Sequence, residues 1–177
     1  MILYKIENDL QQKCYDFALK CVLTNQDEYS RRNQTNKQKI IEDIKIGKIG
    51  EFAAKSYLET YSKSQISKPN LKIYLAKNKK HDYDLVDLYD NFNFSVKTQR
   101  LEDIKKYGKS VLFQKNYIDR IKNKYSKNHN LIYCLHDSEN KFIIIDKELG
   151  FGDIFNMLEE PKLDKLKGNK YAIYFRD

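Results

Sequence analysis

The sequence predicts an α/β (α+β) fold, in which helices flank a central mixed sheet of about five strands. Three observations favour this fold. Apolar residues recur at three- and four-residue steps in residues 7–24 and 35–61, as in amphipathic helices. Short runs of β-branched and aromatic residues follow, including a hairpin pattern around residues 85–96. Residues 131–135 form a continuous apolar run, which is typical of a central strand buried on both faces.

The length and composition fit one domain, residues 1–177, in which residues 1–34 are an N-terminal helical extension of a core at 35–177. Hydrophobic residues make up 41% of the chain, which argues against a disordered protein. The net charge of +8 and the pI near 9.2 indicate an anionic partner, most often nucleic acid. The alternative is a lysine-rich surface that only keeps the protein soluble, and charge alone does not separate the two.

The cysteines and the apolar runs bear on the cellular compartment. Three cysteines, an odd and sparse count, suit a reducing interior. The N-terminus carries no signal-peptide pattern, and no apolar run approaches the ~20 residues that span a bilayer. We therefore expect a soluble, cytoplasmic protein without a membrane partner.

Basic residues gather in the polar stretch after the first predicted helix. Residues 25–39 are predicted to form a loop, and Arg31, Arg32 and Lys37 within it are candidates for contacting a phosphate backbone. A solvated basic linker explains the same residues equally well. Further candidates for nucleic-acid contacts follow along the chain, at Lys48, Arg100, Lys115 and Arg120.

The second predicted helix, residues 35–61, contains two glycines, Gly47 and Gly50. Each costs roughly 1 kcal/mol inside a helix, so a compensating contact is expected. Close approach of the helix backbone to the sheet supplies one, and it directs Glu51 toward the sheet. The alternative is a helix break at Gly47, which leaves Glu51 on the surface.

The hairpin carries the most suggestive polar residues. With Asp90-Asn91 as a two-residue turn, Asp84 lies directly opposite Lys97. Because side chains alternate along a strand, one face then carries five polar residues: Asp82, Asp84, Ser95, Lys97 and Gln99. A carboxylate, a lysine and an amide at one edge of a hairpin suit metal-dependent cleavage of a phosphodiester. A cross-strand ion pair, usually contributing below ~1 kcal/mol, is the structural alternative.

The remaining elements are predicted from pattern alone. Strands are expected at residues 71–76, 131–135, 141–145 and 171–175, and helices at 110–125 and 154–158. The connection at residues 100–109 is polar and carries Glu102.

The element order, with Glu51 on the helix before the sheet and Ser95-Val96-Lys97 on the hairpin, resembles the PD-(D/E)xK nuclease superfamily and its restriction-endonuclease-like fold. The resemblance implies that Asp84 is the first metal-binding aspartate and Lys97 the lysine on the paired strand. It also implies that Glu51, within Gly-x-x-Gly-Glu-x-x-Ala, is the glutamate supplied by the preceding helix. Gln99 matches a glutamine that many members carry two residues after the lysine.

The resemblance covers roughly residues 40–145, and the sequence departs from the family pattern at Ser95, where the family usually has Asp or Glu. A hydroxyl is a poor metal ligand beside a carboxylate. Glu51 is the first choice to replace the missing ligand, and Glu102 the second. Asp82 and Ser95 itself are expected beside the ligands, as supporting groups.

The resemblance implies a site for Mg²⁺, with Mn²⁺ as a substitute, held by Asp84, Glu51 and the backbone carbonyl of Val96. It implies a metal-dependent DNA endonuclease of restriction type, bacterial or phage-encoded, that acts as a homodimer on double-stranded or branched DNA. Two alternatives stay open. One is a Holliday-junction resolvase or phage recombination nuclease, and the other is a non-catalytic nucleic-acid-binding module on the same fold.

Overall fold

The computed structural model describes residues 2–31, 34–75, 83–116, 118 and 128–176. Its helices are α1 (Asn8–Thr24), α2 (Gln26–Arg31), α3 (Lys37–Tyr61), α4 (Leu101–Tyr107) and α6 (Phe151–Met157), with a 3-10 turn η2 (Asp164–Leu166). Its strands are β1 (Ile2–Lys5), β2 (Leu85–Val86), β3 (Asn93–Arg100), β4 (Ser110–Gln114), β5 (His129–Asp137), β6 (Phe142–Gly150) and β7 (Lys170–Tyr174).

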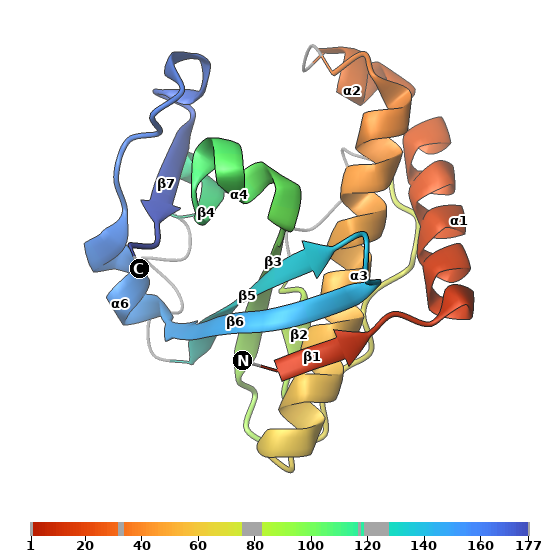
Figure 1. The fold of residues 1–177 in the computed structure, drawn as a ribbon, viewed down its shortest axis with the longest axis vertical. Helices are drawn as coiled ribbons and strands as arrows, with labels where there is room; N and C mark the ends of the chain where they lie inside the picture. Colours follow the sequence, from red (N-terminus) through yellow and green to blue (C-terminus); the bar gives the residue numbers. More distant parts are fainter. Residues whose placement is uncertain (1, 32–33, 76–82, 117, 119–127, 177) are drawn as a thin grey trace.

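Five of these strands form one mixed sheet in the order β1-β6-β5-β3-β2 (Figure 1). Strands β3 and β5 run parallel, whereas the pairs β1–β6, β5–β6 and β2–β3 run antiparallel. Strands β4 and β7 form a separate antiparallel pair. The predicted α+β class, with a mixed sheet of five strands between helices, is confirmed.

The two faces of the sheet are covered by different elements. Ile132 and Cys134 of β5 belong to a core shared with α1 and α3. Leu131 and Tyr133 belong to a second core shared with β4, β7 and α6. Figure 1 shows α3 along one side of the sheet with α1 outside it, and β4, β7 and α6 on the other side. Because side chains alternate along a strand, β5 is buried on both faces, as its apolar run predicts.

Helix α3 runs without a break through both of its glycines. A Cβ added to Gly50 would lie 1.9 Å from Oγ1 of Thr98 on β3, whereas one added to Gly47 would meet nothing within 4 Å. The predicted close approach of helix and sheet is therefore confirmed at Gly50, and it is wrong at Gly47. The alternative of a helix break is also wrong, and Glu51 is buried.

The hairpin is present, but its turn is longer than predicted. Val86 pairs with Asn93, and the N–H of Asp87 donates to the carbonyl oxygen of Phe92 at 2.8 Å. Four residues, 88–91, therefore form the turn instead of two. The Asp87 carboxylate accepts the N–H groups of the two residues numbered 89 and 90, and this local capping stabilises the longer turn.

The longer turn changes the register of the hairpin. Extended by one residue, the observed pairing places Asp84 opposite Ser95, so the predicted cross-strand pair of Asp84 and Lys97 is wrong. A shift of one residue would move every side chain to the opposite face, whereas a shift of two residues keeps each on its predicted face. Asp82, the predicted partner of Gln99, lies outside the described residues.

Two predicted elements take a different form. Residues 71–75 form no strand, and the side chains of Tyr74 and Leu75 are exposed. Residues 110–114, predicted as the start of a helix, form β4, which buries Val111 and Phe113 on one face. Residues 115, 116 and 118 are helical, and the rest of the predicted helix lies outside the described residues.

Three short elements are absent from the sequence prediction. They are β1, α2 inside the predicted loop at 25–39, and α4 inside the predicted connection at 100–109. Each has seven residues or fewer, which is too short for a periodic pattern to stand out. Because β1 pairs with β6, the N-terminal segment adds a strand to the sheet as well as helices. Within the described ranges, no helix is both long and apolar enough to cross a membrane.

Candidate active site

Asp84 is held at the edge of β3, directly before β2. Its backbone N–H donates to the carbonyl oxygen of Phe94 at 3.1 Å, and its Oδ2 accepts the N–H of Val96 at 2.8 Å. These two bonds fix both the backbone and the carboxylate of Asp84 against the strand that carries Lys97. Asp84 therefore still lies beside the strand that carries Lys97, as predicted, although the register of the hairpin differs from the predicted one.

The carbonyl group of Val96 faces the same edge of the sheet. In a strand, the N–H and C=O groups of one residue point toward the same neighbouring strand. Because the N–H of Val96 reaches Asp84, its carbonyl oxygen also points to that side. The direction agrees with the predicted role of this carbonyl as a metal ligand.

Glu51 reaches this edge from α3. It sits on the turn of the helix that lies against β3, and it is only 7% exposed. Burial and then the negative charge of Asp84 raise the pKa of Glu51 to about 7, whereas Lys48 and Lys97 favour its ionised form. The structure thus brings Glu51, Asp84 and Lys97 into one electrostatic neighbourhood, from three separate segments of the chain.

Lys48 is the ion-pair partner of Glu51. Its Nζ lies 2.8 Å and 2.7 Å from the two carboxylate oxygens of Glu51, and 5.5 Å from the ring centroid of Phe17 on α1. Its side chain is mostly buried. The residue predicted as a nucleic-acid contact therefore compensates a buried carboxylate within the protein, which lowers the cost of keeping Glu51 ionised.

Lys97 lies on the opposite face of β3 from the α3 core. Its Nζ is 6.0 Å from the ring centroid of Phe113 on β4. Its charge favours the ionised form of Glu51, against the net rise in the pKa of that residue, and it adds to the effect of burial in lowering the pKa of His129. The ammonium group therefore acts on both sides of the strand, and its side chain is partly exposed.

Ser95 is paired with His129, a residue to which the sequence assigns no role. The Oγ of Ser95 and the Nε2 of His129 lie 2.9 Å apart in a buried hydrogen bond, and both residues are 1% exposed. Burial and the charge of Lys97 lower the pKa of His129 to about 4, so the imidazole is neutral at pH 7. The ring also forms a T-shaped pair with the ring of Tyr83, the residue before Asp84, at a centroid distance of 4.9 Å. His129 thus contacts both segments that carry the site.

The side chain of Gln99 forms hydrogen bonds with the protein's own backbone. Its Nε2 donates to the carbonyl oxygen of Gly108 at 2.9 Å, and its Oε1 accepts the N–H of Ser110 at 2.9 Å and the hydroxyl of Tyr133. The side chain therefore ties β3 to the start of β4. This placement gives the predicted catalytic glutamine a structural role.

Glu102, the second choice for the missing ligand, lies on α4 and is exposed. Its Oε1 is 3.8 Å from Nε of Arg100, and both residues line a pocket that does not include Glu51 or Asp84. Glu51 is therefore the glutamate that the structure brings to Asp84.

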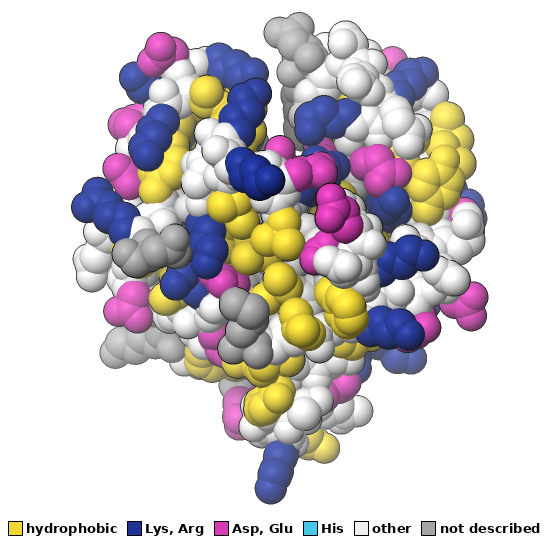
Figure 2. Space-filling model, in the orientation of Figure 1, with side chains coloured by type: hydrophobic (Ala, Val, Ile, Leu, Met, Phe, Trp, Pro, Cys, Tyr) yellow, Lys and Arg dark blue, Asp and Glu magenta, His cyan; other side chains and the backbone are white. Residues whose placement is uncertain are grey.

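The candidate nucleic-acid contacts are dispersed and engaged with other side chains. Arg100 pairs with Asp43 at 2.7 Å, Lys115 with Glu160 at 2.8 Å, and Lys37 donates to the side-chain oxygen of Gln26 at 3.1 Å. The side chain of Arg31 and all of Arg32 and Arg120 lie outside the described residues. On the face drawn in Figure 2, Lys and Arg side chains are interspersed with Asp and Glu rather than gathered in one patch.

The donor set suits a hard divalent cation with few protein ligands. Among the described residues, no three His, Cys, Asp or Glu side chains form a group that could hold a metal ion. Mg²⁺, however, is commonly bound by one or two carboxylates together with waters and substrate phosphate. Burial is the main cause of the raised pKa of Glu51, and repulsion by the Asp84 carboxylate is the second; a cation near both carboxylates would relieve this repulsion. Asp84, Glu51 and the Val96 carbonyl are the groups that would hold such an ion, and the ion would take the place of Lys48 at the Glu51 oxygens.

Comparisons of the chain with protein-family models, with curated proteins and with solved structures find no match.

Proposed function

We propose that the protein is a Mg²⁺-dependent DNA endonuclease, of restriction type in the first instance. The observation that carries the proposal is the convergence of Asp84 and Glu51 at the β3 edge, next to Lys97. Glu51 comes from a helix and the other two from the hairpin, as the resemblance to the PD-(D/E)xK superfamily implies. A homodimer belongs to the proposal, because cutting both strands of a duplex needs two sites.

Each residue has a stated task in this proposal. Asp84 and Glu51 hold the metal with the Val96 carbonyl, and the Val96 N–H keeps the Asp84 carboxylate in place. The bound ion supplies Lewis acidity toward the scissile phosphate and toward a bound water. Lys97 orients the attacking water and offsets the negative charge that develops on the phosphate.

Cleavage assays with plasmid, linear duplex and four-way-junction DNA test the proposal. Wild-type protein is expected to cleave with Mg²⁺ or Mn²⁺ and not with EDTA, and Asp84→Ala and Lys97→Ala are expected to be strongly impaired. Asp90→Ala, from the same hairpin, and Lys55→Ala, from α3, are controls with the same changes in charge. Wild-type rates in both site variants would reject the assignment. Cleavage confined to the junction would identify a Holliday-junction resolvase or recombination nuclease instead.

The second candidate is a non-catalytic nucleic-acid-binding module, and the Ser95–His129 pair favours it. A neutral, buried pair occupies the position where the family usually carries an acidic ligand. Equal DNA-binding affinity in wild type and in both site variants, with no cleavage by any of them, would support this module.

A further inference from the structure

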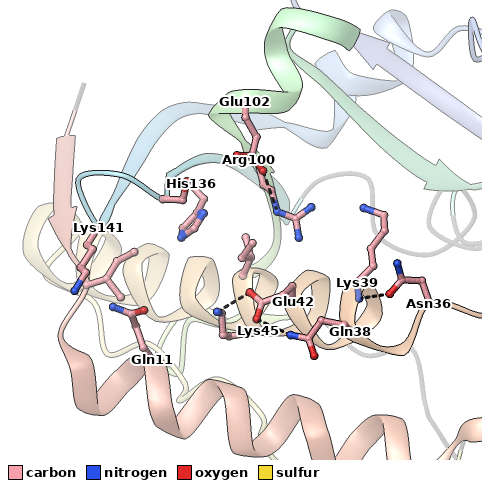
Figure 3. Close-up of a pocket in the computed structure, with 13 residues that line it drawn as sticks. Gln11, Asn36, Gln38, Lys39, Glu42, Lys45, Arg100, Glu102, His136 and Lys141 are labelled. Carbon is pink, nitrogen blue, oxygen red and sulfur yellow. Dashed lines mark hydrogen bonds and ion pairs between the residues drawn. The ribbon is translucent and has the colours of Figure 1, made fainter.

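A pocket of about 570 Å³ lies at the N-terminal half of α3, and neither Glu51 nor Asp84 lines it. Its walls come from α1, α3, the ends of β3 and β5, and the start of α4 (Figure 3). We call it the α3 pocket, and the side chains that matter for its chemistry are Lys39, Lys45, Arg100, His136 and Lys141. It is thus separate from the candidate active site.

A buried histidine faces the α3 pocket. His136 is 9% exposed, and its Nδ1 is buried with no hydrogen-bond partner among the described residues. Figure 3 shows its ring between β5 and α3, directed into the space above the helix. Because buried polar atoms are nearly always satisfied, this nitrogen indicates a group that completes it from within the pocket.

Cationic side chains from three parts of the chain line the same pocket. Lys39 and Lys45 come from α3, Arg100 from the end of β3, and Lys141 from the turn before β6. Two carboxylates, Glu42 and Glu102, also line the pocket, and Glu42 lies 2.6 Å from Nζ of Lys45. The pocket also includes the first turn of α3, a 25-residue helix whose N-terminus carries partial positive charge. A helix N-terminus with arginine and lysine beside it is a favourable setting for phosphate.

The carboxylates around Arg100 differ in how tightly they hold it. Asp43 lies 2.7 Å from Nη2, whereas Glu102 and Asp103, both on α4, lie 3.8 Å and 3.9 Å from the guanidinium nitrogens. The two α4 side chains are 65% and 40% exposed. They are therefore loose partners that a stronger anion displaces at little cost, since exposed pairs at such distances contribute little.

We propose that the α3 pocket binds a phosphate group, carried either by a free nucleotide or by a nucleic-acid strand. Arg100 binds the phosphate oxygens, Lys45 joins it in exchange for its contact with Glu42, and His136 donates a hydrogen bond from Nδ1. Asp43 keeps its contact with Nη2 of Arg100, and the phosphate displaces Glu102 and Asp103 from the other guanidinium nitrogens. The proposal does not depend on cleavage, and it holds for a nuclease and for a binding module alike.

The electrostatics of His136 agree with this arrangement. Burial and the positive charges of Lys45 and Arg100 lower the pKa of His136, and Asp137 and Glu102 oppose them. A bound phosphate would add negative charge beside the ring and raise this pKa. With three histidines in the chain, the ring nitrogens of His136 are readily assigned by NMR.

Calorimetric titration of the full chain in EDTA tests the proposal, with inorganic phosphate, thymidine monophosphate and a short oligothymidylate as probes. Arg100→Gln and Lys45→Gln should each weaken binding at least about tenfold, as expected for a lost charge-assisted hydrogen bond. Glu102→Gln should tighten it, because a competing carboxylate is removed. Lys55→Gln is the matched control, since Lys55 lies on α3 and pairs with Glu59 outside the pocket.

A second variant separates binding from folding. His136→Phe removes the buried Nδ1, so it should weaken phosphate binding without lowering the Tm. Tighter binding of thymidine monophosphate than of oligothymidylate identifies a free nucleotide as the source, and the reverse identifies a strand. No binding of any probe by wild type would overturn the proposal, as would an equal loss in Lys55→Gln or full affinity in His136→Phe. Failure of the nuclease proposal appears separately, in cleavage assays with Mg²⁺.

Discussion

At the scale of single residues, the protonation of Glu51 links the candidate site to stability. Its carboxyl group is buried beside Asp84, so its ionised form is costly in the folded protein. In the unfolded chain, the same group ionises near its ordinary pKa of 4.5. The folded protein therefore binds more protons than the unfolded chain between that value and about 7.

The free energy of unfolding should consequently fall as the pH rises from about 4.5 to about 7, by up to about 3 kcal/mol from this group. Urea unfolding at a series of pH values measures the slope. Glu51→Gln should flatten it and should be relatively more stable above pH 7. Glu59→Gln, which breaks a partly buried pair with Lys55 on the same helix, is the control and should leave the slope unchanged. An identical slope in wild type and Glu51→Gln would contradict the raised pKa.

The Ser95–His129 pair gives a second prediction at this scale. Ser95→Ala removes the hydroxyl and leaves Nε2 of His129 without that hydrogen bond in a buried setting. We expect a loss of about 1–3 kcal/mol in the free energy of unfolding. Adding His129→Leu should recover part of this loss, because removing both polar partners is less costly than removing one. Additive losses in the double variant would show that the two side chains are not coupled.

At the scale of elements, substitutions at the two glycines of α3 distinguish the effect of helix propensity on stability from the effect of packing. Gly50→Ala should destabilise the protein by about 1–3 kcal/mol, because the new methyl group meets Thr98. Rotation of the threonine does not relieve this contact, since its Cβ and Cγ2 lie 3.1 Å and 3.4 Å from the same point. Gly47→Ala, with open space, should stabilise by about 0.5–1 kcal/mol. Thermal unfolding of both variants measures the contrast, and equal effects would contradict the close contact at Gly50.

The elements also show what local sequence determines and what it does not. The helical periodicity that continues along the 25 residues of α3 and the apolar run of β5 are strong local signals, and both elements are confirmed. The hairpin exists as predicted, but its register depends on the side chain of Asp87 and on a bridge between Asp87 and Ile66. Residues 71–75 alternate as a strand does yet find no partner strand among the described residues. A strand pattern specifies a strand only where a neighbour is available to pair with it.

At the scale of the whole molecule, the candidate site joins segments that are distant in the sequence. The resemblance to the nuclease superfamily implies that Glu51, Asp84 and Lys97 form one group, and the glycine pattern of the helix directs Glu51 toward the sheet. The structure brings the three residues into one electrostatic neighbourhood. His129 was not predicted, because its contact with Ser95 depends on the parallel pairing of β3 and β5. Pairing between strands separated by such a long connection has no local sequence signal. The sequence likewise shows that Lys48 and Arg100 are charged, but it does not show that the carboxylates of Glu51 and Asp43 form ion pairs with them.

The central claim is that Asp84, Glu51 and Lys97 cleave DNA with Mg²⁺, and one rate ratio tests it most directly. Single-turnover cleavage of duplex DNA by Lys97→Ala should be slower than that of wild type by at least about 100-fold, as for loss of a group that stabilises transition-state charge. Lys55→Ala should cleave at the wild-type rate. Equal rates for wild type and Lys97→Ala, or DNA binding without cleavage by wild type, would contradict the assignment.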